Sequence, residues 1–212
     1  MKTIWWLLAI LVSVAACGTP NTGKPVAQVI PGTVQASVLT IDELGPMVGS
    51  VLTDSVSSGE PPPAFTTDPA HCAVAVGPGT RSVYATGWNA FWSKTAQDAN
   101  GDHVITQVVG MFTDADQSGK AFTTLTEGLK GCASAVRTDT DEYTTGWAYI
   151  LDRAEPNALG WTATQDTGDG WVCHRQARLK GKAVLQVAVC QAGDGKPAAT
   201  KIVDAFAARV TG

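Results

Sequence analysis

The chain has 212 residues, and its 15 Lys and Arg against 19 Asp and Glu give a formal net charge of −4. No stretch is as densely basic as binding to a phosphate backbone requires, which argues against a nucleic-acid partner. The length suits one substantial domain, and after the N-terminal segment no apolar run is long enough to span a membrane.

The N-terminus has the features of a lipoprotein signal peptide. Met1-Lys2 gives a positive start, and the apolar run 4–14 is shorter than the about 20 residues of a membrane-spanning helix. Val14-Ala15-Ala16-Cys17 then fits the bacterial lipobox. We predict that residues 1–16 are removed and that a lipid on Cys17 anchors the protein to the extracytoplasmic face of the cell membrane. The alternative is an ordinary signal peptide followed by an incidental cysteine.

The cysteine count favours the lipid anchor. The chain has five cysteines, and an odd cysteine in a secreted protein needs an explanation. If lipid occupies Cys17, an even set remains for disulfides in an oxidising compartment, namely Cys72, Cys132, Cys173 and Cys190.

A tether separates the anchor from the folded domain. Residues 17–36 are rich in Gly, Thr, Pro and Gln without a period, which is typical of a flexible segment, so we place the domain at 37–212. At its start, Thr40–Gly45 predicts a short helix, with Thr40 as the N-cap and Glu43 completing a capping box.

Two strands with a tight turn follow. The segment 84–93 predicts an extended strand with Tyr84, Trp88 and Trp92 on one face. The turn 98–102 contains Asn-Gly and joins it to a second strand, 103–111, as a β-hairpin. The aromatic stripe lines a binding groove or, as such stripes more often do, packs under a helix.

Later segments alternate between helix and strand. A helix is predicted from 114 to Gly131, with Thr113 as its cap and Ala115, Phe122, Leu125 and Leu129 at helical spacing. Strands are expected at 147–152, 161–165, 171–179 and 183–191. Pro197 opens a closing helix whose apolar face is Ile202, Val203, Phe206 and Val210. This order predicts an α+β fold with a twisted, mostly antiparallel sheet and packed helices.

The predicted hairpin of the strands 171–179 and 183–191 allows a geometric test of whether two cysteines can form a disulfide. With Gly181-Lys182 as a two-residue turn, counting back along both strands brings Cys173 opposite Cys190 in a non-hydrogen-bonded pair. Cα atoms of such pairs lie about 4.5 Å apart, within disulfide range. The remaining pair, Cys72 with Cys132, would tie the loop before the first strand to the end of the long helix. A bulge or a longer loop in the hairpin stays open as an alternative.

Several candidate motifs do not complete a chemical site. Asp114–Gly119 reproduces half of an EF-hand loop, but Leu125 stands where the bidentate Glu belongs. Asp166-Thr167-Gly168 matches an aspartic-protease tripeptide without the second copy that the chemistry needs. The three histidines are scattered. We therefore predict no metal, no cofactor and no catalytic residues.

The last hairpin is also strongly basic, through His174, Arg175, Arg178, Lys180 and Lys182. It could receive an anionic ligand or an acidic partner, which makes Arg175 and Arg178, with Trp88 and Trp92, candidate contacts for a ligand or partner. The alternative is a charged sheet edge that resists aggregation.

Several of these segments together resemble a known family. The lipobox, the strand "VITQVVGMF" before a helix that ends in Cys, then "GWVCHRQA", "AVLQVAVC" and "IVDAFAARV", are similar to the PknH-like extracellular sensor domain of mycobacteria and relatives. The resemblance covers residues 37–212. It implies a twisted antiparallel sheet with helices around a cleft, and disulfides at Cys72–Cys132 and Cys173–Cys190.

Two functions follow as hypotheses. The first is a membrane-anchored, extracytoplasmic, sensor-like module that binds a small ligand without catalysis. The second is a cell-envelope carrier or interaction protein that contacts lipid, glycan or another surface protein. A deep cavity would favour the first, and a flat exposed Trp or Arg patch would favour a macromolecular partner.

Overall fold

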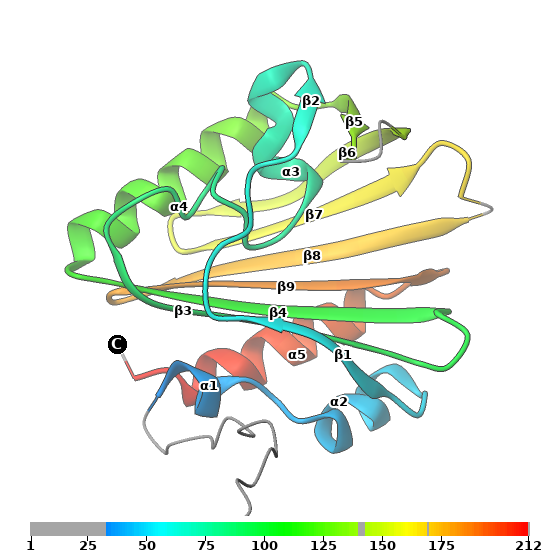
Figure 1. Cartoon of the computed structure of the whole chain (residues 1–212), viewed down its shortest axis with the longest axis horizontal. Coiled ribbons are helices and arrows are strands. Elements are labelled where there is room, and N and C mark those ends of the chain that lie inside the picture. Colours follow the sequence, from blue (N-terminus) through cyan, green and yellow to red (C-terminus); the bar gives the residue numbers. More distant parts are fainter. Residues whose placement is uncertain (1–32, 140–142, 169, 212) are drawn as a thin grey trace, which may run out of the picture.

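The structure is a computed structural model that describes residues 33–139, 143–168 and 170–211 (Figure 1). The predicted signal peptide and Cys17 lie outside the described residues. Helix α1 (Val34–Ser37) begins within the last residues of the stretch predicted as tether, 17–36, and Val34 packs against buried residues. Folded structure therefore already exists at Val34, before the boundary placed at residue 37.

One antiparallel sheet of nine strands organises the molecule (Figure 1). Its spatial order is β1-β3-β4-β9-β8-β7-β6-β5-β2, and every neighbouring pair is antiparallel. The strands are β1 (Thr53–Ser58), β2 (Thr66–Asp68), β3 (Trp88–Gln97), β4 (His103–Phe112), β5 (Ser134–Thr138), β6 (Thr144–Glu155), β7 (Ala158–Gln165), β8 (Trp171–Lys180) and β9 (Ala183–Ala192). The predicted α+β class with an antiparallel sheet is confirmed.

Helices cover both faces of this sheet, as Figure 1 shows. The 3-10 helix η1 (Ala70–Cys72), α3 (Ala73–Val76) and α4 (Ala115–Lys130) lie on one face. Helices α1, α2 (Ile41–Val48) and α5 (Lys196–Arg209) lie on the other. The alternation of side chains along each strand therefore supplies two separate cores, because both faces of the central strands are buried.

The hairpin β8–β9 has the predicted register, with Lys180 paired to Ala183 and Cys173 to Cys190. The charged-edge interpretation of this hairpin is wrong, because β8 also pairs with β7 and β9 also pairs with β4. Three of the basic residues, His174, Arg175 and Arg178, therefore lie within the middle of the sheet, where they find partners in the fold, whereas Lys182 lies in the exposed turn.

The predicted aromatic stripe is also wrong. Tyr84 precedes β3 and is fully buried, with its hydroxyl donating to the carbonyl of Val184 at 3.3 Å. Trp88 pairs with Phe112 and Ala90 with Met111, so β3 has one extra residue between them. This bulge reverses the alternation. Trp88 consequently lies on the α4 side, whereas Trp92 packs against the core under α5.

The helix ends follow the predictions with one change. The capping box of Thr40 and Glu43 is present at α2. Helix α4 is capped by Asp114, which accepts a hydrogen bond from the backbone N–H of Gln117 at 2.8 Å, and not by Thr113. An aspartate at this position also complements the positive end of the helix dipole.

Two disulfides are present, one between segments far apart in the sequence and one within a hairpin. Cys72–Cys132 joins η1 to the residue after the C-cap of α4, across a sequence separation of 60. Cys173–Cys190 joins neighbouring central strands, with the Cα atoms 3.9 Å apart.

The sequence did not predict β1, β2 or β5, which are short and carry few large apolar residues.

Candidate functional site: a cleft on the sheet beside Arg175

A cleft of about 440 Å³ lies on the face of the sheet that carries α3 and α4. This volume falls within the range of about 300–1,000 Å³ that is typical of small-molecule sites. Its lining is Val56, Pro62, Phe65, Val76, Gly77, Pro78, Thr80, Ser93, Thr95, Val104, Thr106, Arg137, Trp147, Gln165, Trp171, Cys173, Arg175 and Cys190. We call it the Arg175 cleft.

Strand register assembles the floor of the Arg175 cleft. Thr95 of β3 pairs with Thr106 of β4, and Thr106 pairs with Ala188 of β9, which pairs with Arg175 of β8. The hydroxyls of Thr95 and Thr106 lie 3.0 Å apart in a hydrogen bond. Since paired residues of adjacent strands point to the same face, this row brings hydroxyls and a guanidinium onto one surface.

Arg175 is the most deeply buried charge of the cleft, with 4% of the residue exposed. Its Nη1 donates to the carbonyl of Ala75, and its Nη2 donates to the carbonyl of Val76 at 3.0 Å. These carbonyls end α3 and would otherwise lack helical partners. Burial lowers the pKa of Arg175 to about 10, so the group stays protonated at neutral pH.

Arg137 of β5 is the second cation of the cleft. Its Nη2 donates to Asp139 at 2.7 Å, and both side chains are about one quarter exposed. The guanidinium lies over the ring of Phe65, at 4.9 Å from the centroid, and 6.0 Å from the ring centroid of Trp147. These aromatic faces hold the guanidinium through cation–π contacts.

Aromatic groups complete this side of the cleft. Trp147 of β6 and Trp171 of β8 both line it. The indole N–H of Trp147 and the hydroxyl of nearby Tyr149 are buried with no hydrogen-bond partner in the described part of the chain. Burial raises the pKa of Tyr149 to about 12, and the charges of Arg175 and Arg137 offset part of that rise.

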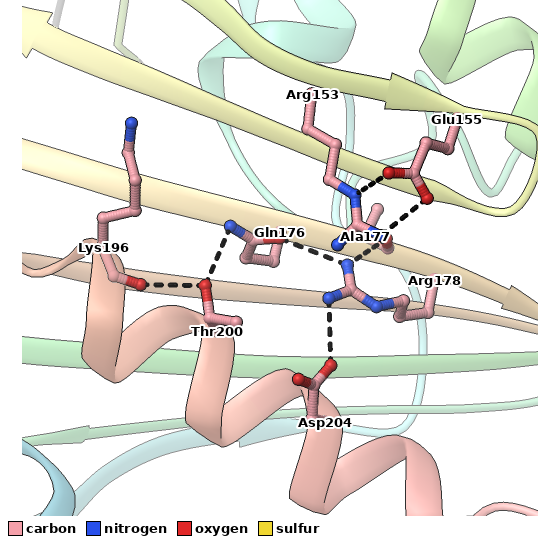
Figure 2. Close-up of polar contacts among 8 residues, drawn as sticks. All are labelled: Arg153, Glu155, Gln176, Ala177, Arg178, Lys196, Thr200 and Asp204. Atoms are coloured by element: carbon pink, nitrogen blue, oxygen red, sulfur yellow. Dashed lines mark hydrogen bonds and ion pairs between the residues drawn. The ribbon is translucent and has the colours of Figure 1, made fainter.

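Of the four residues suggested by the sequence, the structure brings only Arg175 into this cleft. Trp88 lines a different groove beside α1, and Trp92, which is partly buried, packs against the core on the face that carries α1, α2 and α5. Arg178 points to the opposite face (Figure 2). It donates to Gln176 Oε1 at 3.2 Å and to Asp204 of α5 at 3.0 Å.

Figure 2 shows what occupies that opposite face. Gln176 Nε2 lies 3.5 Å from the hydroxyl of Thr200, which donates to the carbonyl of Lys196 at 3.0 Å. Arg153 and Glu155 form a separate pair of hydrogen bonds at 2.7 and 2.6 Å. The polar side chains of β8 at positions 176 and 178 therefore fasten α5 to the sheet and are not available to a ligand in the cleft.

Sequence reasoning missed most of the site. The pairing of Thr95 with Thr106 could have been found by counting back from the turn 98–102, as was done for the cysteines. The sequence could not have shown that Arg137, Phe65 and Trp147 lie together. They meet only because strands distant in the sequence pair and because the loop that carries Phe65 folds back onto them, and no local sequence pattern predicts either arrangement.

No three metal-ligating side chains of His, Cys, Asp or Glu gather anywhere in the described residues. Within 33–139, 143–168 and 170–211, no helix combines the length and the apolarity needed to cross a bilayer.

Comparison with known proteins gives consistent results. A family model described as the PknH-like extracellular domain matches residues 29–209. The proteins named serine/threonine-protein kinase PknH from Mycobacterium bovis (strain ATCC BAA-935 / AF2122/97) and Mycobacterium tuberculosis (strain ATCC 25618 / H37Rv) are both 26% identical over 200 residues. The alignments cover 87% of this chain but 33% and 31% of those proteins, so the chain spans about a third of their length.

A solved structure shares the fold. The crystal structure of the extracellular domain of PknH from Mycobacterium tuberculosis superposes with a TM-score of 0.75 at 22% sequence identity. The match covers 82% of this chain and 92% of that one.

Proposed function

Because this chain belongs to the family of PknH-like extracellular domains, we propose that it is a lipid-anchored, extracytoplasmic, sensor-like protein that binds a small ligand in the Arg175 cleft without catalysis. The observation that carries this proposal is the cleft itself. It has the volume of a small-molecule site, aromatic walls, a hydroxyl-bearing floor and a buried cation. The four candidate contacts, Trp88, Trp92, Arg175 and Arg178, do not form an exposed Trp or Arg patch. Such a patch would have favoured a macromolecular partner.

The anchor is the first part to test. In this proposal, residues 1–16 are the signal peptide, Cys17 carries the lipid, and the chain up to α1 is the tether. Replacing Cys17 with Ser removes the acceptor thiol, so the protein should leave the membrane fraction when cells are fractionated. Unchanged membrane association of the Cys17→Ser variant would show that the anchor assignment is wrong.

The cleft is tested by weighing what it retains. Native mass spectrometry of the mature protein, purified from its own host, should reveal an added mass. Thr106→Phe fills the floor of the cleft and should abolish the added mass. Thr164→Phe, an exposed position on the opposite face of β7, is the matched control and should keep it. An added mass that survives Thr106→Phe, or no added mass in any variant, would contradict cleft binding.

A carrier or interaction protein of the cell envelope is the second candidate. It is favoured by β1, an open edge strand of the sheet whose Val56 is 65% exposed. Unpaired backbone groups on such a strand can accept a strand from another protein. Crosslinking at a photoreactive residue placed at position 57, an exposed residue of β1 that does not line the Arg175 cleft, would capture that partner, and capture of none would leave the first candidate.

A further inference from the structure

We propose that the ligand of the Arg175 cleft is an acidic saccharide, a sugar ring whose carboxylate or phosphate is bound by Arg175 and Arg137. This inference rests on the proposed function and adds the chemical class of the ligand. It starts from the charge of the described residues that line the cleft, among which two are arginines and none is Asp or Glu.

The two arginines differ in how far they are neutralised. Arg137 has Asp139 as its partner. Arg175 has only backbone carbonyls as hydrogen-bond partners, and within the described residues it forms no ion pair with a carboxylate. A buried charge is normally paired, because its removal from water is costly. An anion in the cleft would supply the missing counter-charge.

Arg175 keeps N–H groups that the protein does not use. A guanidinium has five N–H groups, two on each Nη and one on Nε, and the carbonyls of Ala75 and Val76 each accept one N–H from one Nη of Arg175. Each Nη therefore keeps one N–H for an anion, whereas the Nε atoms of Arg175 and Arg137, which also have no hydrogen-bond partner within the described residues, are buried. Carboxylate and phosphate oxygens are the acceptors that match guanidinium geometry.

The remaining lining favours a sugar ring as the body of the ligand. On the β3–β4 side, the floor offers the hydroxyls of Ser93, Thr95 and Thr106. On the other side, the indoles of Trp147 and Trp171 offer apolar faces. A sugar ring has hydroxyls at its edge and C–H groups on its face, so it can satisfy both sides at once. A plain hydrocarbon acid would leave the hydroxyl floor unmatched.

The test is a titration of the full mature protein with four probes, D-glucuronate, D-glucose 6-phosphate, D-glucose and inorganic phosphate. Binding is followed by NMR through the indole N–H signals of Trp147 and Trp171, each assigned by a Trp→Phe substitution. At least one acidic sugar should bind saturably, about tenfold or more tightly than glucose and than phosphate alone, since tenfold is the effect of about one charge-assisted hydrogen bond. The preferred acid identifies the anionic group.

Variants assign the charge to the cleft. Arg175→Gln also removes the support of α3 and so can fail to fold, which makes Arg137→Gln the informative change. Arg137→Gln should weaken the acidic sugar about tenfold and leave glucose unchanged. Arg178→Gln, on the opposite face, is the matched control and should change neither.

Two results would overturn the inference, namely equal binding of glucose and the acids, or acid binding that ignores Arg137→Gln. Failure of all four probes would also overturn it. The native mass experiment separates these failures from failure of the proposed function. If the retained ligand is neutral or cationic and is absent from the Thr106→Phe variant, the cleft is still a ligand site, and only the acidic class of the ligand is rejected.

Discussion

At the scale of single residues, Arg175 connects a structural role to the candidate site. The helix α3 is only four residues long, and the carbonyls of its last two residues are capped by one side chain from the central strand β8. The same guanidinium lines the cleft. The fold thereby places a positive charge in a nearly water-free position without a carboxylate beside it.

We expect Arg175→Ala to lower the free energy of unfolding by about 2–4 kcal/mol, because it leaves two buried carbonyls without donors. Arg153→Ala is the matched control. Arg153 and its partner Glu155 are both about half exposed, so that change should cost about 1 kcal/mol or less. Urea denaturation of both variants measures the difference. Equal costs would show that Arg175 does not support α3.

Glu43 makes the stability of the α2–α5 contact depend on pH. Its hydrogen bond with Arg209, followed by that from the backbone N–H of Thr40, lowers the pKa of this carboxyl from 4.5 to about 2. A lowered pKa in the folded state stabilises above the unfolded value near 4.5, and this contribution is lost as the pH falls from there toward 2.

Glu43→Gln should therefore destabilise the protein by about 1 kcal/mol or less at pH 7, since the pair is partly exposed. The difference from the wild type should shrink between pH 4.5 and pH 3. Urea denaturation across this range, with Asp42→Asn as a control for general charge, checks it. A difference that stays constant down to pH 3 would contradict the assignment to Glu43.

At the scale of elements, the features that could be predicted from the sequence are those fixed by residues close together in the chain. The register of β8–β9 was predicted because a two-residue turn fixes the pairing of everything behind it. The face of Trp88 was mispredicted because one extra residue in β3 reverses the alternation, and nothing in the local pattern marks a bulge. Strand β5, which supplies Arg137, joins the sheet through partners far along the chain, which a local pattern cannot specify.

The closing helix α5 gives a prediction at this scale. Phe206 is completely buried against the sheet, so Phe206→Ala should lower the free energy of unfolding by about 3–5 kcal/mol. Lys201→Ala, an exposed position of the same helix, should change it by about 0.5 kcal/mol or less. Chemical denaturation provides both values, and a cost below about 1 kcal/mol for Phe206→Ala would place that ring outside the core.

The disulfides give a second prediction. Their sequence separations are 60 and 17. On the loop-entropy estimate, removing Cys72–Cys132 should cost about 1 kcal/mol more than removing Cys173–Cys190. Double Cys→Ala variants compared by urea denaturation measure this. A peptide that joins Cys72 to Cys173 or Cys190 in non-reducing mapping would contradict the pairing itself.

At the scale of the whole molecule, the sheet separates a covered face from the face that carries the candidate site. The face with α1, α2 and α5 is covered by apolar packing and by the polar network of Figure 2, with smaller hollows beside α1 and α2. The face with α3 and α4 is covered only in part, and the Arg175 cleft occupies the remainder. The α+β class could be predicted from the order of helices and strands along the chain. Which face of the sheet carries the cleft could not, because it depends on the complete spatial order of the strands.

The position of α1 has a consequence for how a ligand would arrive. The described chain begins at Thr33 and passes at once into α1, on the face of the sheet opposite the cleft. If Cys17 carries the lipid, as proposed above, the tether would join the domain at α1, on the side away from the cleft. A water-soluble molecule diffusing through the envelope would then enter from the open aqueous side, without first being extracted from the lipid to which the protein is fixed.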